Sequence, residues 1–184
     1  MQIKYPEIGI CGLSCRLCPT YHSDSKSKCN GCKSEYRMGA GCPFITCALK
    51  KKGIEFCWQC EESISCKKWS RHREKGRRVD SFKCYQTLED DISFIQKHGV
   101  DEFQKNQKIR EQLLKEMLQN YNEGRSKSYY CIAATVMQID ELKDALIQVK
   151  KDTKNLEIKE KSRVLHSMLD EIAQGKNYLL KLRK

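Results

Sequence analysis

The stretch CRLCPTYHSDSKSKCNGC, residues 15–32, contains two C-x-x-C pairs separated by ten residues. Each pair can direct two thiolates at one metal ion because the chain turns sharply between its cysteines, and Gly31 suits a turn that needs a positive φ. Two such pairs, known as zinc knuckles, complete the tetrahedral shell of a structural zinc ion. The pattern therefore predicts a zinc site formed by Cys15, Cys18, Cys29 and Cys32.

A second group of cysteines follows, and Cys57-Trp-Gln-Cys60 is its clear knuckle. A second zinc ion needs two further ligands besides Cys57 and Cys60, and we favour Cys47 and Cys66 for these positions. The ligands of the two ions can also be interleaved along the chain, and the spacing leaves this alternative open. Cys11 and Cys42 are reserve ligands. The alternative is that both are simply small buried residues.

Cysteine is unevenly distributed along the 184 residues. Ten of the twelve cysteines lie between Cys11 and Cys66, where aliphatic side chains are too sparse to offset the ordering entropy by burial. This part of the chain therefore needs cross-links. The first ten residues (MQIKYPEIGI) lack the apolar run of an export signal, and no apolar stretch reaches the length of a membrane span. We expect metal rather than disulfides, in a cytoplasmic protein that does not enter a membrane.

The chain divides into three parts by composition. Residues 1–66 are the cysteine-rich module, residues 67–86 are a basic connector, and residues 87–184 have helical periodicity. Four helices are expected in the last part, with Thr87 capping the first and Gly99 ending it. They cover residues 87–98, 101–124, 129–151 and 156–174. The expected fold is mainly α: a small irregular zinc-binding module followed by a helical bundle.

The chain is basic, since 35 lysines and arginines against 24 acidic residues give a formal net charge of +11. Thiolates bound to zinc would reduce this charge without reversing it. A basic balance permits binding to nucleic acid, and the segment Lys67–Arg78 is the candidate, with Trp69 or His72 available to stack on bases. A basic run is, however, more often a solvated surface. A protein partner on the helical bundle is the other expected mode of binding.

The spacing Cys11-x-x-x-Cys15-x-x-Cys18 also resembles the three-cysteine loop with which radical S-adenosylmethionine enzymes hold an iron–sulfur cluster. Those enzymes form a barrel of alternating strands and helices, for which this chain is too short and too helical. An iron–sulfur cluster is still an alternative to zinc, because thiolate spacing does not select the metal. A redox or transfer enzyme is the matching alternative function, and Cys84, beside Lys83, is its candidate reactive thiol.

A catalytic zinc site keeps one position open and usually includes a histidine or a carboxylate. His22 is the histidine near the first knuckle, and a lone histidine is more often a packing residue than a ligand. The sequence contains no evident carboxylate–histidine pair, glycine-rich phosphate loop or Ser-His-Asp set. Nothing in it requires an enzyme, and we expect the metal to be structural.

The cysteine motifs occur together with characteristic neighbours: Ile10–Pro19 (ICGLSCRLCP), Cys29–Cys32, Cys47-Ala48 before Lys52-Gly53-Ile54, and Cys57–Cys60 with Cys66 after it. Their order resembles that of an uncharacterised cysteine-rich family of small bacterial and archaeal proteins with a predicted zinc-binding domain of unknown function. The resemblance covers residues 8–70. It implies metal binding and a prokaryotic cytosolic setting, and it supplies no reaction. We therefore predict a zinc-binding protein with a binding or assembly role.

Overall fold

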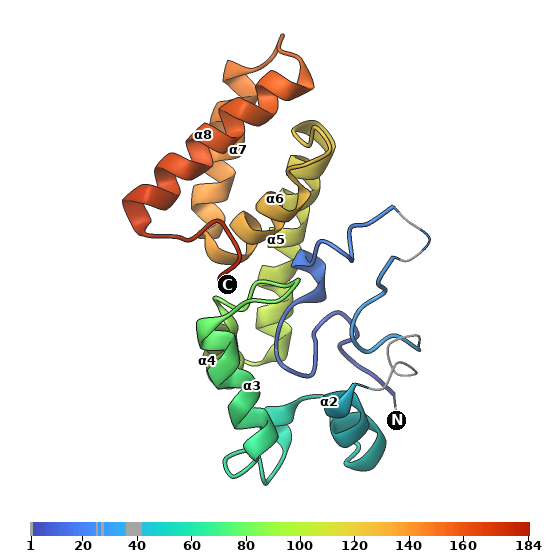
Figure 1. Ribbon diagram of the computed structural model, residues 1–184. Coiled ribbons are helices and arrows are strands. Elements are labelled where there is room, and N and C mark those ends of the chain that lie inside the picture. The colour runs from blue at the N-terminus through green and yellow to red at the C-terminus, as the bar shows by residue number, and fades with distance from the viewer. Residues whose placement is uncertain (1, 25, 27, 36–41) are drawn as a thin grey trace.

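The computed structural model describes residues 2–24, 26, 28–35 and 42–184, and it is mainly helical (Figure 1). These residues form seven α-helices and no strand, apart from a single antiparallel bridge between Ile8 and Ser14. The prediction of a mainly α fold with a helical bundle is confirmed. None of the described helices combines the length and the apolar composition needed to cross a membrane.

The cysteine-rich part consists of loops and short helical turns. Its elements are the 3₁₀ turn η1 (Cys15–Leu17), helix α2 (Pro43–Ile45), the wider turn η2 (Thr46–Lys51) and the 3₁₀ turn η3 (Cys57–Gln59). Helix α3 (Lys67–Arg78) follows and contains the basic segment. The connector is therefore largely helical.

Helices α4 (Leu88–His98) and α5 (Val100–Asn120) meet at Gly99, whose φ of 86° ends α4 as the sequence predicted. The expected side-chain cap at Thr87 is wrong. Thr87 occupies the cap position, but its hydroxyl donates a hydrogen bond to Asp91 Oδ2 at 3.1 Å instead of accepting one from the backbone. The Asp91 carboxyl group holds the hydroxyl as a donor, and among the described residues no backbone N–H of the first turn donates to it.

The helix expected over residues 129–151 is two helices, α6 (Lys127–Val136) and α7 (Ile139–Asp152). The chain is extended at Met137 and Gln138. Arg110 of α5 donates from Nη1 to the carbonyls of Ala134 and Met137, which are left unpaired when α6 ends. The apolar periodicity continues through the break, and for this reason the sequence pattern predicted one helix.

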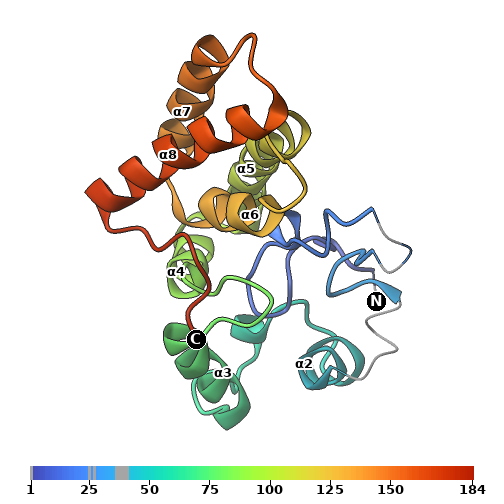
Figure 2. The same cartoon turned by 45° about the horizontal axis from the view of Figure 1, so that its top comes forward.

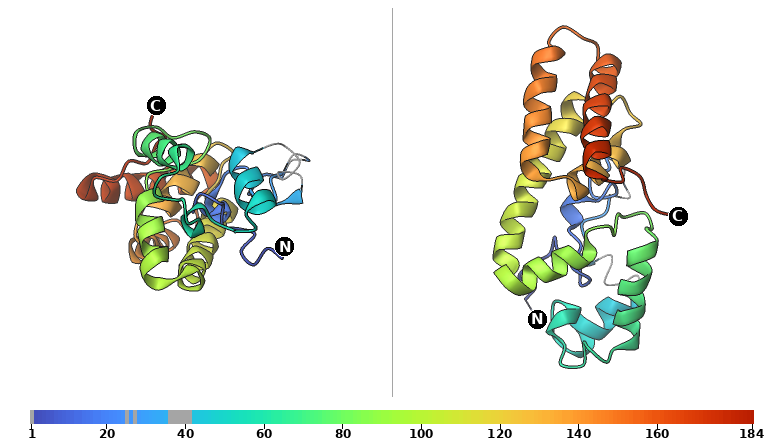
Figure 3. Two further views of the ribbon diagram at one scale, coloured as in Figure 1. Left: turned by 90° about the horizontal axis from the view of Figure 1, so that it is seen from below. Right: turned by 90° about the vertical axis from the view of Figure 1, so that its left-hand side faces the viewer.

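Helix α8 (Ile158–Lys176) packs antiparallel to α7 at one end of the molecule, while α2 and α3 lie at the other end (Figures 1 and 3). The long helix α5 connects the two ends. Its core residues and those of α6, α7 and α8 form the main hydrophobic cluster, in which Leu17 of η1 is included.

Two further clusters join the cysteine-rich part to the helices. In one of them, Ile8 and Phe56 pack against Ile95 of α4 and Phe103 of α5. In the other, Leu13 packs against Trp69, Leu88 and Ile92. The parts that composition separates therefore share their cores.

Both tryptophans lie in the first 70 residues. Trp58 stacks on Phe56 with ring centroids 4.5 Å apart and an interplanar angle of 7°. Trp69 is buried on the inner face of α3, with 3% of its surface exposed. Aromatic packing therefore supports the cysteine-rich part, where aliphatic residues are few.

The segment after α8 returns to the C-terminal end of α3 (Figure 2). Arg183 binds Asp80 through its backbone N–H at 2.7 Å and through its guanidinium at 3.0 and 3.1 Å. The same guanidinium donates to the carbonyls of Gly76 and Arg77 in the last turn of α3. This C-terminal clamp thus satisfies a buried carboxylate and caps a helix with one side chain.

Candidate metal centre

The C-x-x-C pairs form tight local turns. The Cys18 N–H donates to the Cys15 carbonyl at 3.1 Å, and the Cys60 N–H donates to the Cys57 carbonyl at 3.2 Å. Gly31 has a φ of 102°, as expected for the turn between Cys29 and Cys32. A side chain at this position would be strained, and its Cβ would lie 3.2 Å from the Pro6 carbonyl oxygen.

The first two pairs are connected through Cys15 and Cys32. The Cys32 N–H donates to Cys15 Sγ at 3.4 Å. The ammonium group of Lys83 lies 3.3 Å from Cys32 Sγ and 3.9 Å from Cys15 Sγ, in a buried position. Burial would lower the pKa of Lys83, but the neighbouring thiols outweigh it and raise that pKa. The ammonium group of Lys83 thus places a positive charge beside these thiols, and this charge stabilises their ionised form.

Four cysteines converge on one mostly apolar cavity of about 210 Å³. They are Cys11, Cys29, Cys32 and Cys42. His72 of α3 also lines this cavity, and its buried Nε2 has no hydrogen-bond partner among the residues that the structure describes. Burial lowers the pKa of His72 and so favours the neutral imidazole that can bind a metal. Cysteine spacing did not indicate His72 as a ligand, because it lies outside every cysteine motif, and the sequence analysis considered it only for stacking on bases.

The second group of cysteines surrounds Cys57. Burial, together with the charges of neighbouring thiols, raises the pKa of the Cys57 thiol to about 12. The neighbours are Cys11, Cys47, Cys60 and Cys66. Lys52 lies at the edge of this group, with its ammonium nitrogen 3.2 Å from Cys60 Sγ. The charges of the other three cysteines predicted for the second ion therefore act on Cys57, and Cys11 lies near both groups.

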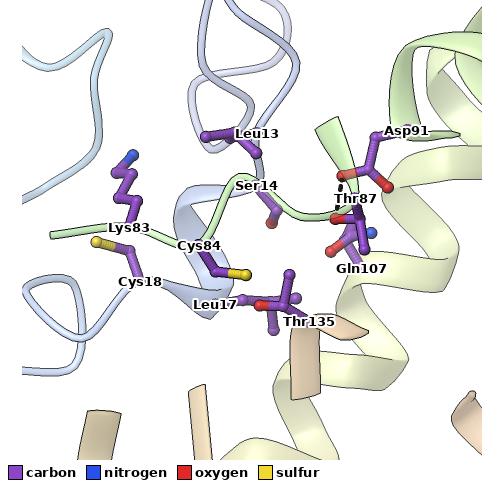
Figure 4. Close-up of a pocket in the computed structure, with 10 residues that line it drawn as sticks. All are labelled: Leu13, Ser14, Leu17, Cys18, Lys83, Cys84, Thr87, Asp91, Gln107 and Thr135. Atoms are coloured by element: carbon purple, nitrogen blue, oxygen red, sulfur yellow. Dashed lines mark hydrogen bonds between the residues drawn. The ribbon is translucent and has the colours of Figure 1, made fainter. Parts of the chain in front are cut away.

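Cys18 has a different environment from the other predicted ligands. Its Sγ lies 3.0 Å from Thr20 Oγ1, and it lines a smaller cavity together with Lys83 and Cys84 (Figure 4). Within residues 2–24, 26, 28–35 and 42–184, no three cysteine, histidine or carboxylate side chains are close enough together to hold one metal ion. The thiols are thus grouped without forming a closed coordination shell.

A buried ion pair fixes the loops that carry the two groups. Lys33 donates from Nζ to Glu55 Oε2 at 2.6 Å and to the Tyr5 carbonyl at 3.1 Å, and it lies 3.9 Å from the centre of the Phe56 ring. Burial would raise the pKa of Glu55, but hydrogen bonds from Lys33 and from backbone N–H groups outweigh it and lower that pKa. Since Lys33 follows Cys32 and Glu55 lies two residues before Cys57, the pair holds the two groups together.

His22, the histidine near the first knuckle, bonds through Nε2 to the Arg16 carbonyl. Burial lowers its pKa. This nitrogen is engaged in the fold, which agrees with a packing role.

The basic helix α3 offers less to nucleic acid than its sequence suggested. Trp69 is buried and His72 packs against it with ring centroids 5.8 Å apart, so neither ring is free to stack on a base; that expectation is wrong. Arg73 and Arg77 both bind Glu89 of α4. Besides Arg78, which pairs with Glu74, the basic residues of α3 that stay exposed outside these ion pairs are Lys67, Lys68, Arg71 and Lys75.

The two cysteines outside the cysteine-rich part are protected. Burial raises the pKa of Cys84 to about 11, opposite to the direction that a reactive thiol requires. Cys131 is buried in the main cluster, and burial raises its pKa to about 12. Neither residue has the low pKa expected of a nucleophile.

Residues 7–71 match a family model described as a protein of unknown function (DUF3795). The match confirms the resemblance to a cysteine-rich domain of unknown function over nearly the residues expected. No curated protein and no solved structure matches the chain.

Proposed function

We propose that this domain of unknown function is a structural zinc module that binds about two zinc ions through thiolates only. Together with the helices that share its cores, it serves as a binding or assembly module. The zinc stabilises loops that have little apolar surface of their own. We do not propose that it takes part in catalysis.

The grouping of thiols around Cys57 carries this proposal. Each thiol that ionises there makes the next ionisation harder, because like charges repel at short range. A divalent cation removes this penalty and releases the protons, so such a cluster gains most from zinc. Lysine side chains at both groups support the same reading, since they place positive charge beside the sulfur atoms.

The proposed ligands of the second ion are Cys57 and three of the thiols whose charges act on it, Cys47, Cys60 and Cys66. For the first ion we retain Cys15, Cys18, Cys29 and Cys32. Cys11 and Cys42 line the same cavity as two of these, and they are the first substitutes to test. A shell of four cysteines has no open position, which favours a structural role over a catalytic one.

The experiment is elemental analysis of protein purified without oxygen, together with its visible spectrum. We expect about two zinc per chain and a colourless solution, and we expect Cys60→Ser to lower the zinc content to about one. Cys131→Ala is the matched control, because Cys131 belongs to the main hydrophobic cluster and is not a candidate ligand, so its removal should leave the zinc content unchanged.

Iron with broad visible absorption would replace the zinc proposal by the iron–sulfur alternative. A folded protein free of any metal would contradict both. For the binding role, the exposed lysines and arginine of α3 predict weak binding to polynucleotide that decreases steeply with salt. Unchanged binding after neutralising Lys67, Lys68 and Arg71 would remove α3 from this role.

A further inference from the structure

A second candidate site lies in the helical part, away from the candidate metal ligands. A cavity of about 630 Å³ opens between α4, α5, the junction of α6 with α7, and the segment that follows α8. Ligand sites in proteins commonly have volumes of roughly 300–1,000 Å³. The cavity is therefore large enough for a small organic molecule.

Gln107 of α5 is the unusual residue in the lining of this cavity. It is 5% exposed, and its Oε1 has no hydrogen-bond partner within the described part of the chain. Figure 4 shows Gln107 beside Thr87, where a smaller cavity of about 20 Å³ adjoins the large one. A buried acceptor without a partner is costly, so a site of this kind calls for a donor. The required group is an N–H or an O–H.

Asp91 lies next to Gln107 in both cavities. Its Oδ2 accepts the hydrogen bond from Thr87, while the described contacts provide no donor to Oδ1. Burial raises the pKa of Asp91 to about 7, although Arg110 opposes this shift. The Nη1 of Arg110 is itself engaged by the two carbonyls at the end of α6. The carboxylate therefore keeps one oxygen for a ligand.

The lining is acidic in a protein that is basic. Three carboxylates, from Asp90, Asp91 and Asp140, line the cavity against one cation, Arg110, and Asp140 also pairs with Lys143 outside it. The whole chain, in contrast, has a formal charge of +11. The apolar part of the wall includes the rings of Phe94, Phe103 and Tyr178. Aromatic faces attract organic cations and also cover their hydrocarbon parts. Excess negative charge with aromatic walls suits an organic cation better than an anion or a fully hydrated metal ion.

We propose that this cavity binds a small organic amine, with its ammonium group on Asp91 Oδ1 and Gln107 Oε1 and its hydrocarbon part against Phe94 and Tyr178. A primary ammonium group has three donors, so it can serve both oxygens at once. The proposal is independent of zinc, because none of these residues is a candidate metal ligand.

Isothermal titration calorimetry with 2-phenylethylamine tests the proposal, and 2-phenylethanol is the neutral control of the same shape. We expect saturable binding of one amine per chain and at least tenfold weaker binding of the alcohol, which corresponds to about 1.4 kcal/mol. Asp91→Asn should weaken binding of the amine by about tenfold or more and leave binding of the alcohol unchanged. Gln107→Leu should weaken binding of the amine as well.

Asp144→Asn is the matched control, because Asp144 is an exposed carboxylate on α7 outside the cavity and its loss should leave the amine affinity unchanged. Circular dichroism verifies that each variant is folded. If Asp91→Asn or Gln107→Leu is not folded, Asp140→Asn, at an exposed position on the rim of the cavity, is tested in its place. Equal binding of amine and alcohol would overturn the proposal. Absence of saturable amine binding would do the same, and so would full amine affinity in the folded Asp91→Asn variant.

Discussion

Removal of the Arg183 side chain is the perturbation whose effect the structure defines best. The guanidinium binds Asp80, whose side chain is fully buried, and it caps the last turn of α3 through the carbonyls of Gly76 and Arg77. Asp80 also accepts a hydrogen bond from the Tyr85 N–H at 2.6 Å, so it stays in place when Arg183 is replaced. Arg183→Ala therefore leaves a buried carboxylate without its counter-charge.

Breaking a buried ion pair on one side costs roughly 3–5 kcal/mol. The Arg183 side chain is 23% exposed, so water screens part of the interaction and the lower end of this range applies. We expect Arg183→Ala to reduce the free energy of unfolding by about 3 kcal/mol. For a chain of this length each kcal/mol lowers Tm by roughly 2–4 °C, so the expected decrease is about 6–12 °C.

Urea unfolding followed by far-ultraviolet circular dichroism measures this loss. The control is Arg78→Ala on the same helix, because its pair with Glu74 is exposed on both sides and should contribute no more than about 0.5 kcal/mol. Asp80→Asn combined with Arg183→Ala should recover part of the stability, since the buried charge is then absent. If Arg183→Ala costs no more than Arg78→Ala, the C-terminal clamp is not a stabilising contact and the reasoning is refuted.

Three further predictions concern buried polar groups. Tyr130→Phe removes the hydroxyl that donates to the buried Tyr121 carbonyl at 3.0 Å, and it should cost about 1–2 kcal/mol in the same urea assay; an unchanged midpoint would contradict this. Iodoacetamide should alkylate Cys84 in the folded protein about 100-fold more slowly than a free thiol at pH 8, because burial raises its pKa to about 11, and mass spectrometry of time points would reveal any faster reaction. The raised pKa of Asp91, about 7, means that the folded state holds this proton more tightly than the unfolded state. Its contribution to stability therefore decreases as pH rises from about 4 to about 7, and Asp91→Asn should show a smaller decrease over that range.

The helices could be predicted from local patterns, and their limits only in part. Gly99 ends α4 because its positive φ is a property of a single residue. The break between α6 and α7 could not be predicted, since it depends on Arg110 of α5, a residue 24 positions from Ala134. A contact between distant residues leaves no trace in the apolar period of either helix.

The same distinction between local pattern and distant contact applies to the cysteines. The turns at Cys15–Cys18 and Cys57–Cys60 are local, and spacing was enough to predict them. The position of Cys11 near both groups, and of His72 at the cavity of the first, depends on how α3 folds back onto the loops. The sharing of thiolates between the two ions therefore remains a prediction that only metal analysis of single variants can decide.

Because both tryptophans lie before residue 70, tryptophan fluorescence and circular dichroism report on different parts of the protein. Fluorescence of Trp58 and Trp69 follows the environment of the cysteine-rich loops, whereas the helical ellipticity comes mostly from residues 88–176, where tryptophan does not occur. Coincident midpoints in one denaturation experiment would indicate a single cooperative unit, as the shared cores suggest. Separate midpoints would indicate that the loops melt on their own, and removal of zinc would then shift the fluorescence curve alone.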